Sequence, residues 1–285
     1  MTVYKDFVLL DAMSLIHTLT NQLQQLPDQK MRLKVCDAWV TYFASPYLYI
    51  PAENPIGMDT QRVLPVLCID QKDSGGHYWR HRHYSGYKTG RPAKAPLLLS
   101  TRDYLYDLWT KADLPYLVQD GFEADDHVGQ WVKGMMPGEK VAMVSVDSDW
   151  AQLVGPNVMW LDTFPPSRRT GESQKCNVLG HDEVLTRFNT QRAFSKHLLS
   201  NPYDLVEHKW VFGDRSDSLP GNKSVDRGII DLLAPLESPD PMRADGYRCV
   251  PLSKVWSFPP LPHAATHYAF GVPDWMGRDG DRYDF

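Results

Sequence analysis

The chain has 285 residues, of which 42% are hydrophobic and 12% aromatic, so it can build a substantial core and is not globally disordered. Its formal net charge of −5 argues against a protein that binds nucleic acid through overall charge. The N-terminus shows no signal-peptide pattern and no run approaches the roughly 18 apolar residues of a membrane span, so we expect a soluble, cytoplasmic protein.

The first 150 residues alternate short apolar runs with helical patterns. In chain order, buried strands are predicted at 7–10, 63–69, 114–118 and 141–146, and helices at 14–26, 32–43, 97–112 and 123–135. Ser14 is expected to cap the first helix, which would stop at Pro27. Strands that alternate with helices predict an α/β fold, with a mostly parallel sheet flanked by helices on both faces.

The rest of the chain turns helical and then loses its periodicity. Helices are predicted at 182–188, 191–199, 203–212 and 225–233, with a turn rich in glycine, proline and serine at 213–221. From Pro235 to the end, eight prolines fall within 51 residues. We therefore predict an α/β domain at 1–180, a small helical module at 181–235 and a proline-rich extension of unassigned role at 236–285.

Nine carboxylates stand at the ends of predicted elements. Asp11, Asp70 and Asp147 each follow a different apolar strand. Because ligands of parallel sheets bind beyond the carboxyl ends of the strands, we expect these three in one crevice. Like charges are unfavourable in a folded core unless cations neutralise them, so the whole set is predicted to bind metal. The candidate ligands are Asp11, Asp70, Glu123, Asp125, Asp126, Asp147, Asp149, Asp214 and Asp217.

Spacing within this set favours a shared site. Asp147 and Asp149 are two residues apart, which points both side chains to one face of an extended segment. Glu123 and Asp126 share a helix face by their i,i+3 spacing, whereas Asp125 lies off that stripe. Acids at a helix start are, taken alone, explained equally well by the helix dipole. Oxygen ligands select hard cations, so two Mg²⁺ are predicted, with Mn²⁺ as a substitute.

Zinc is not expected, because the cysteines lack metal-binding spacing and are predicted to be reduced thiols. The four are Cys36, Cys68, Cys176 and Cys249.

A stretch without any acid runs from residue 74 to residue 102. Its six basic residues are Arg80, Arg82, Lys88, Arg91, Lys94 and Arg102. Trp79, Tyr84 and Tyr87 alternate with these cations, a composition that suits phosphates and unstacked bases. A solvated surface loop is the alternative. Lys88 is our candidate for neutralising a phosphate in a transition state.

These motifs resemble, in kind and in order, the flap endonuclease and 5′-3′ exonuclease superfamily, and most closely its small bacteriophage exonucleases. The resemblance spans residues 7 to about 233, and five motifs in order are far more specific than any one of them. It implies a PIN-like domain followed by a helix-three-turn-helix module that grips duplex DNA. The matching pieces are Leu10-Asp11, Ile69-Asp70, Trp79-Arg80, Tyr87-Lys88, Arg91, Glu123-Ala124-Asp125-Asp126, Val146-Asp147-Ser148-Asp149, Gly213-Asp214, Ser216-Asp217 and Pro220-Gly221.

The resemblance also implies roles for individual residues. One metal would be held by Asp11, Asp70, Glu123, Asp125 and Asp126, and the second by Asp147, Asp149, Asp214 and Asp217. Lys88 and Arg91 would be catalytic, at the foot of an arch through which a 5′ strand passes. Substrate-binding positions would be Arg80, Arg82, Tyr87, Lys94 and Lys223. One departure is that Asn222-Lys223-Ser224 directly follow Gly221, where relatives have a second glycine-rich turn, so a monovalent cation in the module is left open.

The function implied by the resemblance is Mg²⁺-dependent hydrolysis of DNA phosphodiester bonds by a 5′-3′ exonuclease or flap endonuclease with a two-metal mechanism. The expected partner is DNA with a 5′ end or flap, in phage DNA replication, recombination or primer removal. Two alternatives stay open: an RNase H-like or PIN-type ribonuclease acting on RNA or RNA–DNA hybrid, and a non-catalytic factor that binds branched DNA.

Overall fold

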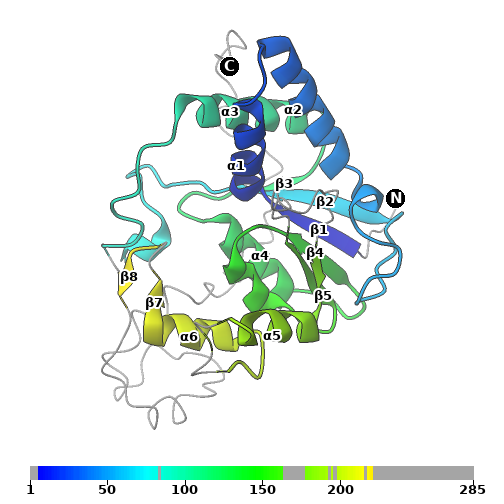
Figure 1. The fold of residues 1–285 in the computed structure, drawn as a ribbon, viewed down its shortest axis with the longest axis vertical. Helices are drawn as coiled ribbons and strands as arrows, with labels where there is room; N and C mark the ends of the chain where they lie inside the picture. The colour runs from blue at the N-terminus through cyan, green and yellow to red at the C-terminus, as the bar shows by residue number, and fades with distance from the viewer. Residues whose placement is uncertain are drawn as a thin grey trace.

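The computed structural model describes residues 6–82, 85–162, 177–191, 194, 198–214 and 217–220. A six-stranded sheet, in the order β3-β2-β1-β4-β5-β6, lies at its centre (Figure 1). The first five strands run parallel and β6 is antiparallel. The mostly parallel α/β fold predicted from the sequence is thereby confirmed. The strands are β1 (Asp6–Asp11), β2 (Val63–Cys68), β3 (Tyr116–Leu117), β4 (Lys140–Val144), β5 (Val158–Asp162) and β6 (Asn177–Leu179).

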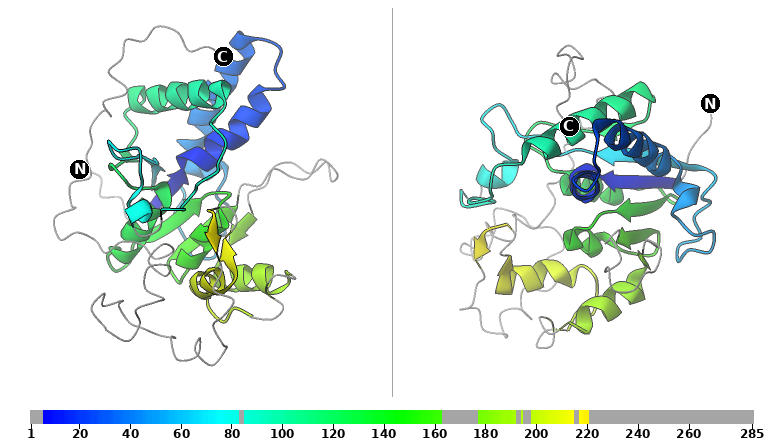
Figure 2. Two further views of the ribbon diagram at one scale, coloured as in Figure 1. Left: turned by 90° about the vertical axis from the view of Figure 1, so that its left-hand side faces the viewer. Right: turned by 45° about the horizontal axis from the view of Figure 1, so that its top comes forward.

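Helices cover both faces of this sheet. Helices α1 to α3 lie on one side and α4 to α6 on the other (Figures 1 and 2). Short 3₁₀ turns η1 (Pro46–Leu48), η2 (Trp79–Arg82) and η3 (Ser148–Leu153) connect the elements. In the part of the chain that is described, no helix is both long and apolar enough to cross a bilayer. The helices are α1 (Ala12–Leu23), α2 (Gln29–Phe43), α3 (Pro96–Lys111), α4 (Ala124–Lys133), α5 (His181–Asn189) and α6 (Asp204–Phe212).

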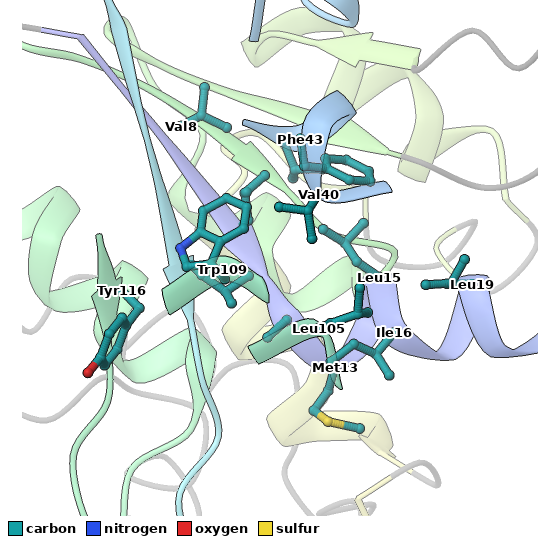
Figure 3. Packing of buried hydrophobic residues seen from close by; sticks show 14 of the residues in the cluster. Val8, Met13, Leu15, Ile16, Leu19, Val40, Phe43, Leu105, Trp109 and Tyr116 are labelled. Carbon is teal, nitrogen blue, oxygen red and sulfur yellow. The ribbon is translucent and has the colours of Figure 1, made fainter. Parts of the chain in front are cut away.

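Strand β1 explains why the apolar runs of this sequence do not alternate with polar residues. Val8 and Leu10 face a core built with α1, α2 and α3, shown in Figure 3. Leu9, between them, faces a second core built with α4, α5 and η3. Successive side chains of a strand point to opposite faces, so a strand covered on both sides must be apolar throughout. The sheet is therefore covered on both faces, and the ends of its strands position the side chains that follow them.

The first helix begins earlier than the sequence predicted. The expected cap, Ser14, lies inside α1; Asp11 is the N-cap, and its carboxylate accepts a hydrogen bond from the Ser14 backbone N–H at 3.1 Å. Aspartate and serine are both good caps, so the sequence offered two starts three residues apart. The choice of Asp11 matters because it ties the strand-end carboxylate to the helix.

Among its described residues, the helical region contains less α-helix than predicted. Helices α5 and α6 match two of the four predicted segments, but Gln191, Phe194, Leu198 and Leu199 are not α-helical. Residues 225–233 and 236–285 lie outside the described chain. Side chains of α5 and α6, such as Val184 and Leu205, are part of the second core of the sheet. The division at residues 180 and 181 stays a prediction.

The turn predicted at 213–221 contains a small β-hairpin. Strands β7 (Gly213–Asp214) and β8 (Leu219–Pro220) pair antiparallel directly after α6. Gly213 ends the helix with a φ of +81°, a conformation that favours glycine because a side chain would be strained there. Directly after this turn, Asp214 lies close to Asp149 of η3, with carboxylate oxygens within 4.8 Å of each other.

Candidate metal and nucleic-acid site

The carboxyl ends of three adjacent strands hold the aspartates that the sequence placed together. Asp11 is the last residue of β1, Asp70 follows β2 by two residues, and Asp147 follows β4 by three. Because β1 lies between β2 and β4, the three side chains meet at one edge of the sheet. They line a cavity of about 1200 Å³. The carboxylates in its lining are Asp11, Asp70, Glu123, Asp125, Asp147, Asp149 and Asp217.

Asp11 is held by two serines from neighbouring elements. The hydroxyl of Ser14, in α1, donates to it at 2.5 Å, and the hydroxyl of Ser145, just after β4, donates at 2.6 Å. Ser145 also accepts from the Asp147 backbone N–H at 2.9 Å. Burial raises the pKa of Asp11, and the negative charge of Asp70 raises it further. Ser145 thus joins two strand ends, a role that no local pattern of residues indicates.

The start of α4 supplies the next carboxylates. Asp70 accepts a hydrogen bond from the Ala124 backbone N–H at 2.8 Å, so it sits against the helix N-terminus, where the dipole favours negative charge. Glu123 and Asp125 line the cavity. Asp126 is not part of the described lining: its carboxylate accepts from the Glu123 N–H at 2.9 Å and caps the helix from within. At the start of α4 the structure thus places Asp125, but not Asp126, in the cavity lining, although oxygens of Glu123, Asp125 and Asp126 lie within 4.8 Å of one another and could together hold a cation.

Arg80 lies beneath these acids and not on the surface. Its side chain is 2% exposed and pairs with Glu123 at 2.9 Å, Asp125 at 3.2 Å and Asp126 at 2.7 Å. Trp79 donates its indole N–H to Asp126 at 2.9 Å. A guanidinium presents several donors in a fixed fork, which suits a group of carboxylates. In this structure the Arg80 guanidinium contacts the acidic motif, and its contact with a phosphate stays a prediction.

Tyr87 is likewise buried. It is 1% exposed, and its hydroxyl donates to Glu123 at 2.7 Å. This position does not present the ring for stacking on a base. The side chain of Arg82 and the whole of Lys223, two other predicted substrate contacts, lie outside the described residues.

The second group of acids comes from segments far apart in the chain. Oxygens of Asp149, Asp214 and Asp217 lie within 4.8 Å of one another. Asp149 belongs to η3, while the hairpin after α6 supplies the other two. Burial, aided by the negative charge of Asp147, raises the pKa of Asp149 to about 6. Lys209, which the sequence analysis did not single out, contacts both Asp149 and Asp214.

Four of the six basic residues in the stretch from residue 74 to residue 102 line the same cavity: Lys88, Arg91, Lys94 and Arg102. The ammonium of Lys88 contacts Glu123 and lies 3.9 Å from Asp217, and Arg91 pairs with Asp217 at 2.5 Å. The Lys88 backbone N–H donates to the Asp217 carbonyl at 2.8 Å, and Ser218 donates to the Thr89 carbonyl at 2.7 Å. These two bonds connect the basic loop that contains Lys88 and Arg91 to the hairpin formed by β7 and β8.

The donor set fits hard divalent cations. Seven carboxylates line one cavity, and burial raises the pKa of Asp11, Asp70, Asp147, Asp149 and Asp217. A raised pKa means that the ionised form is disfavoured where it stands, and a bound cation removes that penalty. Oxygen ligands favour Mg²⁺ or Mn²⁺ over zinc. Cys36 and Cys68 are buried free thiols away from this lining.

His127 provides a stability test of the α4 region. It is buried beside Phe122, with ring centroids 6.3 Å apart, and burial lowers its pKa to about 4. The unfolded chain, with a histidine pKa near 6.5, takes up the proton first as pH falls, so this residue's contribution to stability declines between about pH 6.5 and pH 4. We expect wild type, relative to His127→Phe, to lose about 2 kcal/mol of unfolding free energy between pH 7 and pH 5. Urea denaturation of the metal-free proteins measures this; a pH-independent difference would contradict it.

Comparison with known proteins agrees with the fold. A family model described as the 5′-3′ exonuclease N-terminal resolvase-like domain matches residues 7–189. The chain belongs to this 5′-3′ exonuclease family. It is 30% identical over 188 residues to DNA polymerase I of Synechocystis, covering 64% of this chain and 17% of that protein. It is 31% identical over 158 residues to the flap endonuclease Xni of Colwellia psychrerythraea, covering 55% of this chain and 48% of that protein.

The chain is also similar to a bacterial exonuclease and to a phage flap endonuclease of known structure. The 5′-3′ exonuclease of Aquifex aeolicus is 28% identical over 163 residues, which cover 56% of this chain and 49% of that protein. The chain thus spans about half, or less, of these curated relatives. A crystal structure of the bacteriophage T5 flap endonuclease shares the fold, with a TM-score of 0.51 at 16% identity, covering 88% of this chain and 86% of that chain.

Proposed function

We propose that this protein is a nuclease that hydrolyses DNA phosphodiester bonds as a 5′-3′ exonuclease or flap endonuclease, with two divalent cations, Mg²⁺ or Mn²⁺. One observation carries the proposal: seven carboxylates from distant segments line a single cavity together with Lys88, Arg91 and Lys94. Anionic ligands for metal and cationic groups for phosphate are both required by such chemistry, and they occur here side by side.

The two groups of carboxylates would hold the cations separately. Bound there, the cations would supply a nucleophilic water and neutralise charge on the reacting phosphate. The first set is Asp11, Asp70, Glu123 and Asp125, with Asp126 acting through the capping of α4. The second set is Asp147, Asp149, Asp214 and Asp217.

The substrate we propose is DNA with a 5′ end or flap. The named relatives support it: a flap endonuclease, a 5′-3′ exonuclease and a phage flap endonuclease crystallised with DNA and metal ions. The corresponding role is removal of flaps or primers in DNA replication or recombination, in the cytoplasm where that DNA resides (the host cytoplasm if the chain is phage-encoded).

A flapped duplex labelled at its 5′ end tests the proposal directly. With Mg²⁺ we expect release of short 5′ products, and none in EDTA. RNA and RNA–DNA hybrids of the same sequence run in parallel, since cleavage of RNA alone would favour the ribonuclease alternative. Tight binding of the flap without cleavage in Mg²⁺ or Mn²⁺ would favour the non-catalytic factor and overturn the proposal.

Lys88→Ala is expected to slow single-turnover cleavage by about 100-fold, with at most a modest loss of DNA affinity. The reason is position: its ammonium lies at the junction of the two acidic groups, contacting Glu123 and approaching Asp217. Lys94→Ala is the matched comparison, because Lys94 lines the same cavity, 3.8 Å from the Met13 sulfur, and should affect mainly affinity. Normal turnover with a large affinity loss in Lys88→Ala would restrict that residue to docking.

A further inference from the structure

Lys209 occupies an unexpected place among the acids of the second group. Its side chain is 19% exposed and extends from α6 onto η3, against which the helix packs. The ammonium donates to a carboxylate oxygen of Asp149 and, at 2.5 Å, to one of Asp214. The Lys209 ammonium therefore contacts two of the three carboxylates whose oxygens lie within 4.8 Å of one another.

The third acid of the group also faces a cation. Asp217 pairs with Arg91 at 2.5 Å and lies 3.9 Å from Lys88. The charge of three carboxylates is thus already offset by protein side chains. A divalent cation placed among the same oxygens would meet the Lys209 ammonium at close range, where like charges repel strongly.

The first group is arranged differently. There Arg80 approaches Glu123, Asp125 and Asp126 from below, and it is buried, away from the described cavity lining. Asp11 and Asp70 are held by serine hydroxyls and a backbone N–H. In this group the Lys88 ammonium contacts one acid, Glu123, while these uncharged donors serve Asp11 and Asp70. In the second group Lys209 contacts two of the three acids. The two groups should consequently differ in their affinity for metal.

We propose that Lys209 is a built-in competitor for the second cation: its ammonium and a divalent ion exclude each other from Asp149 and Asp214. Lysine carries a compact charge on a flexible stem, so it can leave this position when a stronger anion offers itself. The phosphates of bound duplex are such an anion. DNA binding would then draw Lys209 away and admit the second metal, which couples full metal loading to the presence of substrate. This rests on the proposed function for the identity of the anion.

The test measures Mn²⁺ binding to the full-length protein by electron paramagnetic resonance, without DNA and without turnover. Wild type should show one tighter and one weaker class of site. Lys209→Met should raise the affinity of the weaker class by about tenfold or more, because a positive charge in direct contact with two ligands is gone. Lys209→Arg, which retains the charge, should stay near wild type.

Lys72→Met is the matched control for charge alone. Lys72 lines the same cavity, so its removal also takes one positive charge from the lining while leaving Asp149 and Asp214 paired with Lys209. We expect less than about a twofold change there. Circular dichroism confirms that each variant is folded. An unchanged or lowered weak-class affinity in Lys209→Met, or an equal rise in Lys72→Met, would overturn the proposal.

A second arm adds a closed dumbbell duplex, which has no 5′ end to cut. The dumbbell should raise the weaker Mn²⁺ affinity of wild type and leave Lys209→Met nearly unaffected. An equal rise in both proteins would overturn the displacement of Lys209 by DNA. Because neither arm uses cleavage, a protein that shows these metal affinities but does not cut flapped DNA would refute the proposed nuclease and leave the competition by Lys209 standing.

Discussion

Replacement of Asp147 by alanine is expected to lower cleavage of a flapped duplex by about 1000-fold or more while leaving DNA binding intact. The Asp147 carboxylate lines the cavity, three residues beyond the end of β4. Its removal also takes a negative charge away from a surface that faces a polyanion, so affinity should be unchanged or tighter.

The fold should tolerate this substitution. The backbone N–H of Asp147 donates to Ser145, a bond that alanine keeps; the bond lost is that from the Asp149 N–H to the Asp147 carboxylate, at 3.0 Å. Single-turnover rates and fluorescence anisotropy provide the two readouts. Asp107→Ala is the control, since Asp107 pairs with Lys111 on α3 outside the cavity. Retained turnover in Asp147→Ala would refute the assignment of the metal site.

Arg80→Met is expected to cost about 3–5 kcal/mol of unfolding free energy, because it leaves three carboxylates without their shared buried cation. The guanidinium contacts Glu123, Asp125 and Asp126 and is itself almost fully enclosed. Activity should fall too, since Glu123 and Asp125 would lose the contact that orients them toward the cavity.

Urea denaturation in EDTA measures this loss without a contribution from metal. Arg62→Met is the matched control: Arg62 pairs with Asp59 at 4.0 Å on the surface, 84% exposed, and should change stability by less than about 0.5 kcal/mol. If Arg80→Met were as stable as wild type, the buried ion-pair group would not support α4 as described.

The sequence predicted the strand ends because each one combines an apolar run with a terminal acid. Asp11 and Asp70 could be placed in one crevice on that pattern alone, since parallel strands end at the same edge. Strands β5 and β6 were missed. β5 has four apolar residues followed by Asp162, and β6 has three residues, so neither is long enough for periodicity to distinguish a strand.

Local sequence does not indicate whether a charged side chain contacts acids of the protein or faces the cavity. Arg80 lies in a stretch rich in cations, which indicated a phosphate contact, yet α4 brings three acids to it from more than 40 positions away. The contact of Lys209 with Asp149 could not be predicted from local sequence, because the two residues are 60 positions apart. Such pairings depend on tertiary packing, and a charge pattern along the chain does not contain them.

The hydrogen bonds between Lys88 and Thr89 and the hairpin after α6 indicate how much of the chain the site requires. The Lys88 N–H and the Thr89 carbonyl are bonded to Asp217 and Ser218, far beyond residue 189, where the recognised family domain stops. A fragment that ends at residue 189 would retain the whole six-stranded sheet. It would lack Asp214 and Asp217, and with them the hydrogen bonds that hold Lys88 and Thr89 in place. Any truncation, graft or fusion that aims to keep catalysis must therefore extend through the hairpin.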